Sequence, residues 1–187
     1  MDQRDLVERA GRGDHDAFAV LVGATIARLE AVARLILRDP ELARDAVQEA
    51  YFRAWRDLPG LRDPDKFDAW MHRLTVNASL DAVRRRKRRP MEVELTPATP
   101  QSMGDPTGLI VDRDELDAGF RHLSADLRAI LVLHYYVGMT MPTVAQTLGI
   151  PLGTAQSRLN RALTNLRRAM GRPATPAGPV AQRGQVA

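Results

Sequence analysis

The side chains best suited to recognition chemistry lie between residues 67 and 90, where cations, an amide and a basic run follow one another. Arg73, Asn77 and Arg84 are separated by four and seven residues, so a helix would carry them along one narrow side. Arginines bind phosphates and a side-chain amide can hydrogen-bond a base, which together suit single-stranded nucleic acid. The basic run from Arg84 to Arg89 continues this side. It predicts a phosphate-binding surface, although such runs are also common at solvated helix ends.

A second set of polar side chains lies near the C-terminal end, in a predicted helix over residues 152–170. Winding this helix at 100° per residue gathers its alanines and leucines on one side. The opposite side and its flanks carry Gln156, Ser157, Arg158, Asn160 and Arg161. These residue types read base edges and hold phosphates, and the helix contains no acid to repel a phosphate backbone. The pattern predicts a DNA-reading helix, and a bundle helix with a polar outer face is the alternative.

A large aromatic residue, Phe52, lies in the charged face of a third predicted helix, over residues 41–57. Its neighbours on that face are Asp45, Gln48, Glu49 and Arg56. The core of this helix is already supplied by an apolar stripe on the opposite face, so packing within the domain does not explain Phe52. The residue is typical of an anchor for a protein partner, although a single exposed aromatic is also common.

Helices are needed to position all three sets, and the sequence predicts an all-α fold. Through the first ninety residues apolar side chains recur at three- and four-residue spacing, and no stretch alternates like a strand. Two helices are expected before residue 39, with a break near 11–14 and a stop at Asp39–Pro40. A flexible loop over 58–67 precedes a long helix from Phe67 to Arg88, whose two apolar faces predict packing on both sides.

The C-terminal half predicts a helix-turn-helix. Ser124 is a suitable N-cap for a helix to about Val137, Thr140 can cap the next helix, and Gly149 centres a tight turn before the last. Prolines and glycines separate this part from the first, and we predict two small helical domains joined by a flexible acidic linker. The segments are a first domain (1–89), the linker (90–111), the helix-turn-helix domain (112–170) and a disordered tail (171–187).

Charge supports two separate binding surfaces. The net charge is only +4, but residues 61–90 carry nine basic and four acidic groups, and seven arginines with no acid follow Asp126. Residues 91–126, between these blocks, carry two basic and eight acidic groups. Two positive blocks predict two surfaces that meet a polyanion, and ordinary solvated charge is the alternative.

Composition excludes several classes of protein and site. The chain has no cysteine, which rules out disulfides and thiolate metal sites and fits a reducing cytosol. The charged N-terminus does not resemble a secretory signal, and no apolar run is long enough to span a bilayer, so we expect a soluble cytoplasmic protein. The four histidines are scattered and the acids lack metal-ligand spacing. We therefore expect no cofactor and no catalytic activity, against the rival interpretation of a DNA-processing enzyme.

Three stretches carry a family resemblance: "DAVQEAYFRAW", "FDAWMHRLTVNASLDAVRRRKRR" and "GTAQSRLNRAL". They resemble signature segments of bacterial RNA polymerase sigma factors of the compact extracytoplasmic-function (ECF) type, which keep only regions 2 and 4. The resemblance covers about residues 5–89 and 112–170, with the motifs in the family's order. It implies a dissociable subunit that binds core RNA polymerase and directs transcription initiation by recognising the −10 and −35 elements of promoter DNA.

The resemblance also implies a role for each matching position. The segment that docks on the clamp of the polymerase β′ subunit would use Asp45, Gln48, Glu49 and Phe52. The segment that binds the −10 element would use Arg73, Asn77, Asp81, Arg84, Arg85 and Arg88. The helix that enters the major groove at the −35 element would use Gln156, Ser157, Arg158, Asn160 and Arg161. The acidic linker matches a segment in the polymerase cleft. The β′ and β subunits are expected partners, and an anti-sigma factor, a common regulator in the family, is another.

Two positions depart from the family pattern. Thr143 stands where many members have a glutamate after "GMT", and Gln156 stands where lysine or arginine is common. Both bear on how the last two helices dock on the −35 element. A stand-alone helix-turn-helix regulator remains the rival function, but it would leave Phe52 and the Arg73, Asn77 and Arg84 stripe without a role.

Overall fold

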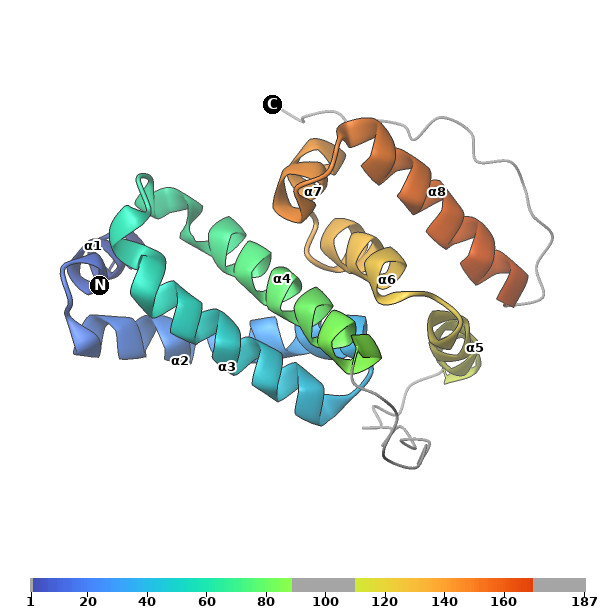
Figure 1. Cartoon of the computed structure of the whole chain (residues 1–187), viewed down its shortest axis with the longest axis horizontal. Coiled ribbons are helices and arrows are strands. Elements are labelled where there is room, and N and C mark those ends of the chain that lie inside the picture. Colours follow the sequence, from blue (N-terminus) through green and yellow to red (C-terminus); the bar gives the residue numbers. More distant parts are fainter. Residues whose placement is uncertain (1, 89–109, 170–187) are drawn as a thin grey trace.

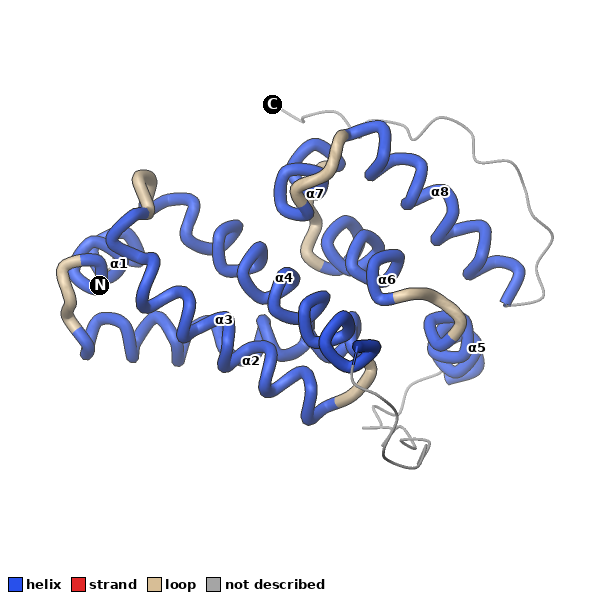
Figure 2. Tube along the Cα trace, viewed as in Figure 1, coloured by secondary structure: helices blue, strands red, loops and turns tan. Residues whose placement is uncertain are grey.

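The structure is a computed structural model that describes residues 2–88 and 110–169, and every regular element in these ranges is a helix. Figures 1 and 2 show two groups of helices side by side, one from the N-terminal half and one from the C-terminal half. The predicted all-α fold with two helical units is confirmed. Most of the predicted linker (90–111) and the whole predicted tail (171–187) lie outside the described residues.

The first unit consists of α1 (Gln3–Gly11), α2 (His15–Leu37), α3 (Pro40–Asp57) and α4 (Phe67–Arg88). The carboxylates of Asp14 and Asp39 accept backbone N–H bonds from the first turns of α2 and α3, which satisfies donors that have no partner inside the helix. Pro40 occupies the first position of α3, where its missing N–H is not needed. These local signals produce the breaks expected near residues 11–14 and at Asp39–Pro40.

α4 lies at the centre of the molecule and packs on two sides, as its pattern predicted. Phe67, Met71 and Ala78 belong to a core shared with α1, α2 and α3. Val76 and Leu80, on another side of the same helix, belong to a second core that includes residues of α6 and α7. The polar residues of α4 that could meet a nucleic acid are therefore confined to the remaining narrow side.

The predicted loop 58–67 contains two short 3₁₀ turns, η1 (Leu58–Gly60) and η2 (Pro64–Lys66). The Leu58 side chain is buried, and the Asp63 carboxylate accepts the backbone N–H of Asp65 at 3.2 Å. Arg4 of α1 donates to the Asp65 carboxylate at 2.9 Å. The segment before α4 is thus tied to α1 by contacts that the Pro and Gly content did not predict.

The second unit consists of α5 (Ile110–Arg121), α6 (Ala125–Leu131), the π-helical segment η3 (Val132–Tyr136), α7 (Met141–Leu148) and α8 (Leu152–Ala169). The hydroxyls of Ser124 and Thr140 accept backbone N–H bonds at the starts of α6 and α7, as predicted. Gly149 ends α7 with a φ of 64°, a left-handed conformation that suits glycine. The expected helix-turn-helix arrangement of α7 and α8 follows.

One predicted helix differs in its last turns. A single α-helix was expected from Ser124 to about Val137, but α6 ends at Leu131 and widens into η3. The Val137 N–H donates to the Val132 carbonyl at 2.9 Å, five residues back, which is the π-helical pattern. Met139 N–H then donates to the Leu133 carbonyl at 3.0 Å across Gly138, whose φ is 82°. The bonding of this corner sets the helix end, and apolar periodicity alone does not encode it.

The two units share a core and a set of polar contacts. Val32 and Ile36 of α2, with Val76 and Leu80 of α4, belong to the same apolar cluster as the buried residues of the second unit. Across this boundary the Arg128 Nε donates to the Ile36 carbonyl at 2.6 Å, near the C-terminal end of α2. The closeness of α4 and α7 in Figure 1 reflects this shared packing.

Arg128 also joins the boundary to the end of α5. Its Nη1 donates to the Leu123 carbonyl at 2.6 Å and to the Phe120 carbonyl at 3.4 Å. Burial, and then the nearby Arg38, lower the pKa of the Arg128 guanidinium below its ordinary value. Arg38, which closes α2 with a φ of 58°, donates to both carboxylate oxygens of Asp117 at 2.7 and 2.9 Å.

Candidate nucleic-acid interface

The free side of α4 carries the predicted nucleic-acid residues, which we call the α4 stripe: Arg73, Asn77, Asp81, Arg84, Arg85 and Arg88. The four arginines are exposed and the two other residues are half-buried. Because an α-helix rises about 1.5 Å per residue along its axis, the stripe extends over about 22 Å from Arg73 to Arg88. That length is enough for several phosphates of a single strand. The structure brings these residues together on one helix as predicted, while their contact with DNA stays a prediction.

Ion pairs within the first unit modify this stripe. The two Asp81 oxygens accept from different arginines: Oδ1 from Arg84 Nη1 at 3.2 Å, and Oδ2 from Arg53 Nη1 of α3 at 3.4 Å. The Arg53 Nε donates in turn to Glu49 Oε1 at 2.8 Å, and this hydrogen bond raises the pKa of Arg53 above its ordinary value. Sequence reasoning did not assign Arg53, whose partner on α4 lies 28 residues away.

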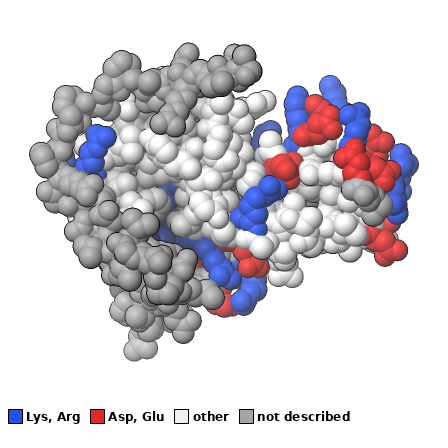
Figure 3. Space-filling view, turned by 180° about the vertical axis from the view of Figure 1, so that it is seen from behind, with Lys and Arg blue, Asp and Glu red and all other residues white. Residues whose placement is uncertain are grey.

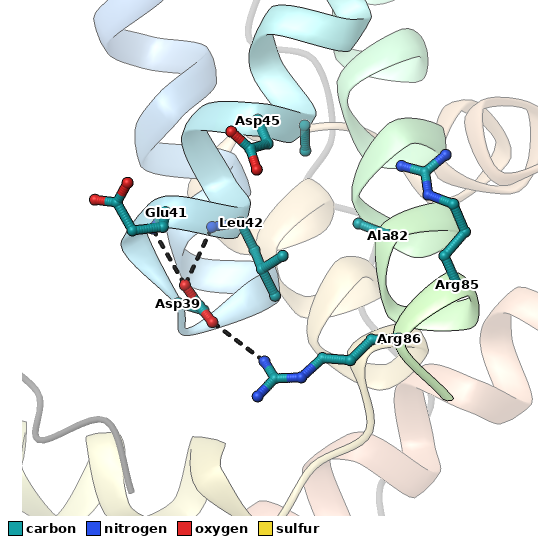
Figure 4. Close-up of a pocket in the computed structure, with 8 residues that line it drawn as sticks. Asp39, Glu41, Leu42, Asp45, Ala82, Arg85 and Arg86 are labelled. Carbon is teal, nitrogen blue, oxygen red and sulfur yellow. Dashed lines mark hydrogen bonds and ion pairs between the residues drawn. The ribbon is translucent and has the colours of Figure 1, made fainter. Parts of the chain in front are cut away.

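A cleft of about 490 Å³ separates the start of α3 from the end of α4. Figure 4 shows acidic side chains on the α3 side and arginines on the α4 side, and the lining residues are Asp39, Glu41, Leu42, Asp45, Ala46, Ala82, Arg85 and Arg86. One ion pair, between Arg86 Nη1 and Asp39 Oδ2 at 3.2 Å, crosses the cleft. Because Asp39 also caps α3, its ion pair ties Arg86 to the start of that helix. Of the two neighbouring arginines, Arg85 and not Arg86 therefore belongs to the α4 stripe.

The predicted partner-binding residues form one face of α3, which we call the α3 face: Asp45, Gln48, Glu49 and Phe52. Phe52 is 68% exposed, the largest exposed fraction among the large hydrophobic residues that are exposed in the described chain. Asp45 and Gln48 are exposed and Glu49 is half-buried by its bond to Arg53. The opposite side of α3 is buried, with Trp55 stacked on His15 at a centroid distance of 4.4 Å. Phe52 is therefore not required by the core.

The predicted DNA-reading residues form the outer face of α8, which we call the α8 face: Gln156, Ser157, Arg158, Asn160 and Arg161. Arg158 is half-buried and the others are exposed. Ala155, Leu159 and Ala162 are buried beneath them, as expected. The structure places this face in the second unit, so it does not combine with the α4 stripe into one site.

Thr143, one of the two positions that depart from the family pattern, makes local contacts at the start of α7. Its hydroxyl lies 2.9 Å from the Thr140 hydroxyl, and its backbone N–H donates to the same Thr140 oxygen at 3.4 Å. This resembles a capping box in which the third helical residue usually reaches back with a glutamate. The two threonines thus close the start of α7 without a charged side chain.

Charge elsewhere on the molecule is mixed. Figure 3 shows, on the face opposite to that of Figure 1, cations and acids intermingled at the end formed by the N-terminal helices, with a broad uncharged area next to them. Such mixing does not create a field of one sign. In the described part of the chain no group of three or more His, Asp or Glu residues could hold a metal ion. None of the described helices is both long and apolar enough to cross a membrane.

Comparison with known proteins identifies the family. The Sigma-70 region 2 model matches residues 21–89, and the Sigma-70 region 4 model matches residues 113–166. The chain is 30% identical over 171 residues to the RNA polymerase sigma-H factor of Pseudomonas aeruginosa, covering 85% of this chain and 89% of that protein. The chain belongs to the sigma-70 family of RNA polymerase sigma factors. The first match contains the α3 face and the α4 stripe, and the second contains the α8 face.

Further matches specify the type and the fold. The chain is 32% identical over 161 residues to the ECF RNA polymerase sigma factor SigM of Mycobacterium tuberculosis, covering 85% of this chain and 80% of that protein. The sigma factor RpoE of Bartonella quintana, solved with the anti-sigma factor NepR, shares the fold with a TM-score of 0.65 at 22% identity, over 82% of this chain and 96% of that one. These matches confirm the expected ECF type and the two-unit helical fold.

Proposed function

We propose that this ECF sigma factor binds core RNA polymerase through the α3 face, the −10 element through the α4 stripe and the −35 element through the α8 face. Residues 1–89 would then form the unit for polymerase and the −10 element, and residues 112–170 the unit for the −35 element. The core polymerase supplies the nucleotidyl-transfer chemistry, and the sigma factor works beside it in the cytoplasm. The exposed Phe52, on the helix that packs directly against α4, is the observation that carries this assignment.

Chemical complementarity supports the division between the faces. The α4 stripe has four exposed arginines for phosphates, and the half-buried Asn77 offers an amide to a base edge. The α8 face offers amide, hydroxyl and guanidinium groups near the N-terminal half of a helix, where major-groove readers carry them. The α3 face surrounds one exposed aromatic, a residue type enriched at protein interfaces, with the polar side chains that are usual at an interface rim.

Promoter binding requires the two units to separate. The names of the two elements place them about 25 base pairs apart, which is about 85 Å of B-form duplex. In the structure α4 packs on α7 and α7 on α8, so the α4 and α8 axes are only about 20 Å apart at helix spacings of 8–10 Å. The 21 residues 89–109 join the units, and a chain of that length reaches at most about 70–75 Å, to which the units add their own widths.

Run-off transcription with core polymerase tests the proposal directly. Wild-type protein should direct specific initiation on genomic fragments, and Phe52→Ala should weaken its affinity for core polymerase about 30-fold, the size of a typical hot-spot loss. Val20→Ala, which shortens a side chain 46% exposed on α2, is the matched control and should leave that affinity unchanged. An unchanged affinity for Phe52→Ala would show that the α3 face does not dock on the polymerase.

The −35 assignment has its own test. Arg161→Ala should reduce transcription from a promoter with an intact −35 element several-fold, but not from one whose −35 sequence is scrambled. Arg121→Ala, an exposed arginine of α5, serves as the control. The rival regulator predicts nanomolar binding to a palindromic duplex without polymerase, so a binding measurement with the free chain separates the two functions.

A further inference from the structure

A line of four charged side chains joins the α3 face to the α4 stripe. Glu49 of the α3 face pairs with Arg53 at 2.8 Å, Arg53 with Asp81 at 3.4 Å, and Asp81 with Arg84 of the α4 stripe at 3.2 Å. The charges alternate in sign along the line, and two acids balance two cations. Arg53 is the member that bridges the two helices.

Burial distinguishes the inner members from the outer ones. The Arg53 and Asp81 side chains are 25% and 35% exposed, whereas Arg84, at the outer end, is 60% exposed. Arg53 is therefore the least solvated of the four, and its planar fork bonds Glu49 and Asp81 through different nitrogens. A guanidinium held by two carboxylates on different helices has little freedom to turn toward a ligand.

Asp81 presents an electrostatic problem in a surface for DNA. Its carboxylate repels a phosphate placed beside it and also holds the Arg84 guanidinium, which would otherwise bind that phosphate. Arg53 counters both effects, because it neutralises Asp81 from the side of α3 and occupies the Oδ2 oxygen. With Arg53 in place, a phosphate can compete with a single contact of 3.2 Å for Arg84.

We propose that Arg53 is a positioning residue for −10 recognition: it neutralises Asp81 and thereby leaves Arg84 available to a promoter phosphate, while it holds Glu49 in the α3 face. This inference rests on the proposed function of the α4 stripe and gives a role to a residue outside the three predicted faces. It also gives Asp81 a definite part in the stripe, since the carboxylate orients Arg84 until a phosphate replaces it.

The decisive measurement is the affinity of the holoenzyme, formed at saturating core polymerase, for a fluorescent single strand carrying the −10 element. Arg53→Met, which keeps the length of the side chain and removes its charge, should weaken this affinity about three- to tenfold, as expected when one phosphate contact is lost. The slope of log affinity against log salt should fall by about 0.7, the value for one single-strand phosphate. A change confined to folding would not alter this slope.

A double-mutant cycle tests whether Arg53 acts through Asp81. In an Asp81→Asn background the carboxylate charge is gone, so Arg53→Met should change the affinity by less than about twofold. Arg53→Lys retains the charge and should stay within about threefold of wild type. An equal loss from Arg53→Met in both backgrounds, or no loss in the wild-type background, would overturn the proposal.

Controls separate this inference from the function beneath it. Arg44→Met removes an exposed arginine of the same helix that pairs only with Glu41 among the ion pairs of the described residues, and it should leave the affinity unchanged. Arg84→Ala should weaken binding by itself. If wild-type holoenzyme does not prefer the −10 strand to a scrambled strand, or Arg84→Ala has no effect, the assignment of the α4 stripe fails. If only the Arg53 variants behave as wild type, the positioning role alone fails.

Discussion

Replacing Arg128 by methionine should destabilise the protein by weakening the contact between its two units. The guanidinium donates to the carbonyls of Ile36 and Leu123 at 2.6 Å each, and to that of Phe120 at a weaker 3.4 Å. The first bond crosses from α6 to the end of α2, and the others hold the end of α5. Methionine keeps most of the side-chain volume but offers no donor, so the carbonyls lose their partner.

The magnitude follows from the two short bonds. A hydrogen bond from a charged donor contributes about 1.5–3 kcal/mol, and loss of the partner leaves a poorly solvated carbonyl. Part of this loss is offset, because the variant no longer has to bury a charged guanidinium, whose burial opposes folding and lowers its pKa. We expect the free energy of unfolding to fall by about 2–4 kcal/mol, a large fraction of the 5–15 kcal/mol that is usual for a folded domain.

Urea unfolding followed by circular dichroism measures this loss. Because Arg128 joins the units, the variant should also unfold in two separated transitions where wild type shows one. Arg121→Met is the control: this arginine is 52% exposed and its pair with Asp117 is long, at 3.5 Å, so the change should be below about 1 kcal/mol. An Arg128→Met midpoint equal to that of wild type would refute the assignment of Arg128 as the link between the units.

Three further predictions concern stability. Burial, and then Arg28, lower the pKa of His72 to about 4 from 6.5. The unfolded chain therefore binds this proton more readily, and the free energy of unfolding should fall by about 2 kcal/mol from pH 7 to pH 5. In urea titrations at each pH, His72→Leu should remove this pH dependence. Gly149→Ala should lower the free energy of unfolding by about 1–2 kcal/mol, because φ is 64° at this turn between α7 and α8, although the added methyl group has open space. A melting temperature equal to that of wild type would contradict this. Tyr51→Phe should cost about 1 kcal/mol by removing the buried 2.7 Å bond to Thr25, as measured by chemical denaturation.

The sequence alone determined the local features of this protein. Capping residues such as Asp39 and Ser124 act within one turn of a helix, and the period of the apolar residues is a property of each segment. This is why the limits of α4, the faces of α3 and α8 and the helix-turn-helix could be read from residue order. The exposure of Phe52 followed in the same way, because the opposite side of its helix already supplied the core.

Only the tertiary structure decided which polar groups meet across helices. Arg53 and Asp81 are 28 residues apart, Arg38 and Asp117 are 79 apart, and Arg128 lies 92 residues from Ile36. No local pattern encodes these pairs, because each depends on how two helices pack and at what height along their axes. The same holds for the core shared by the two units, which exists only once Val76 and Leu80 of α4 are placed against α6 and α7. Helix faces are local and periodic, whereas their partners are set by packing between distant segments.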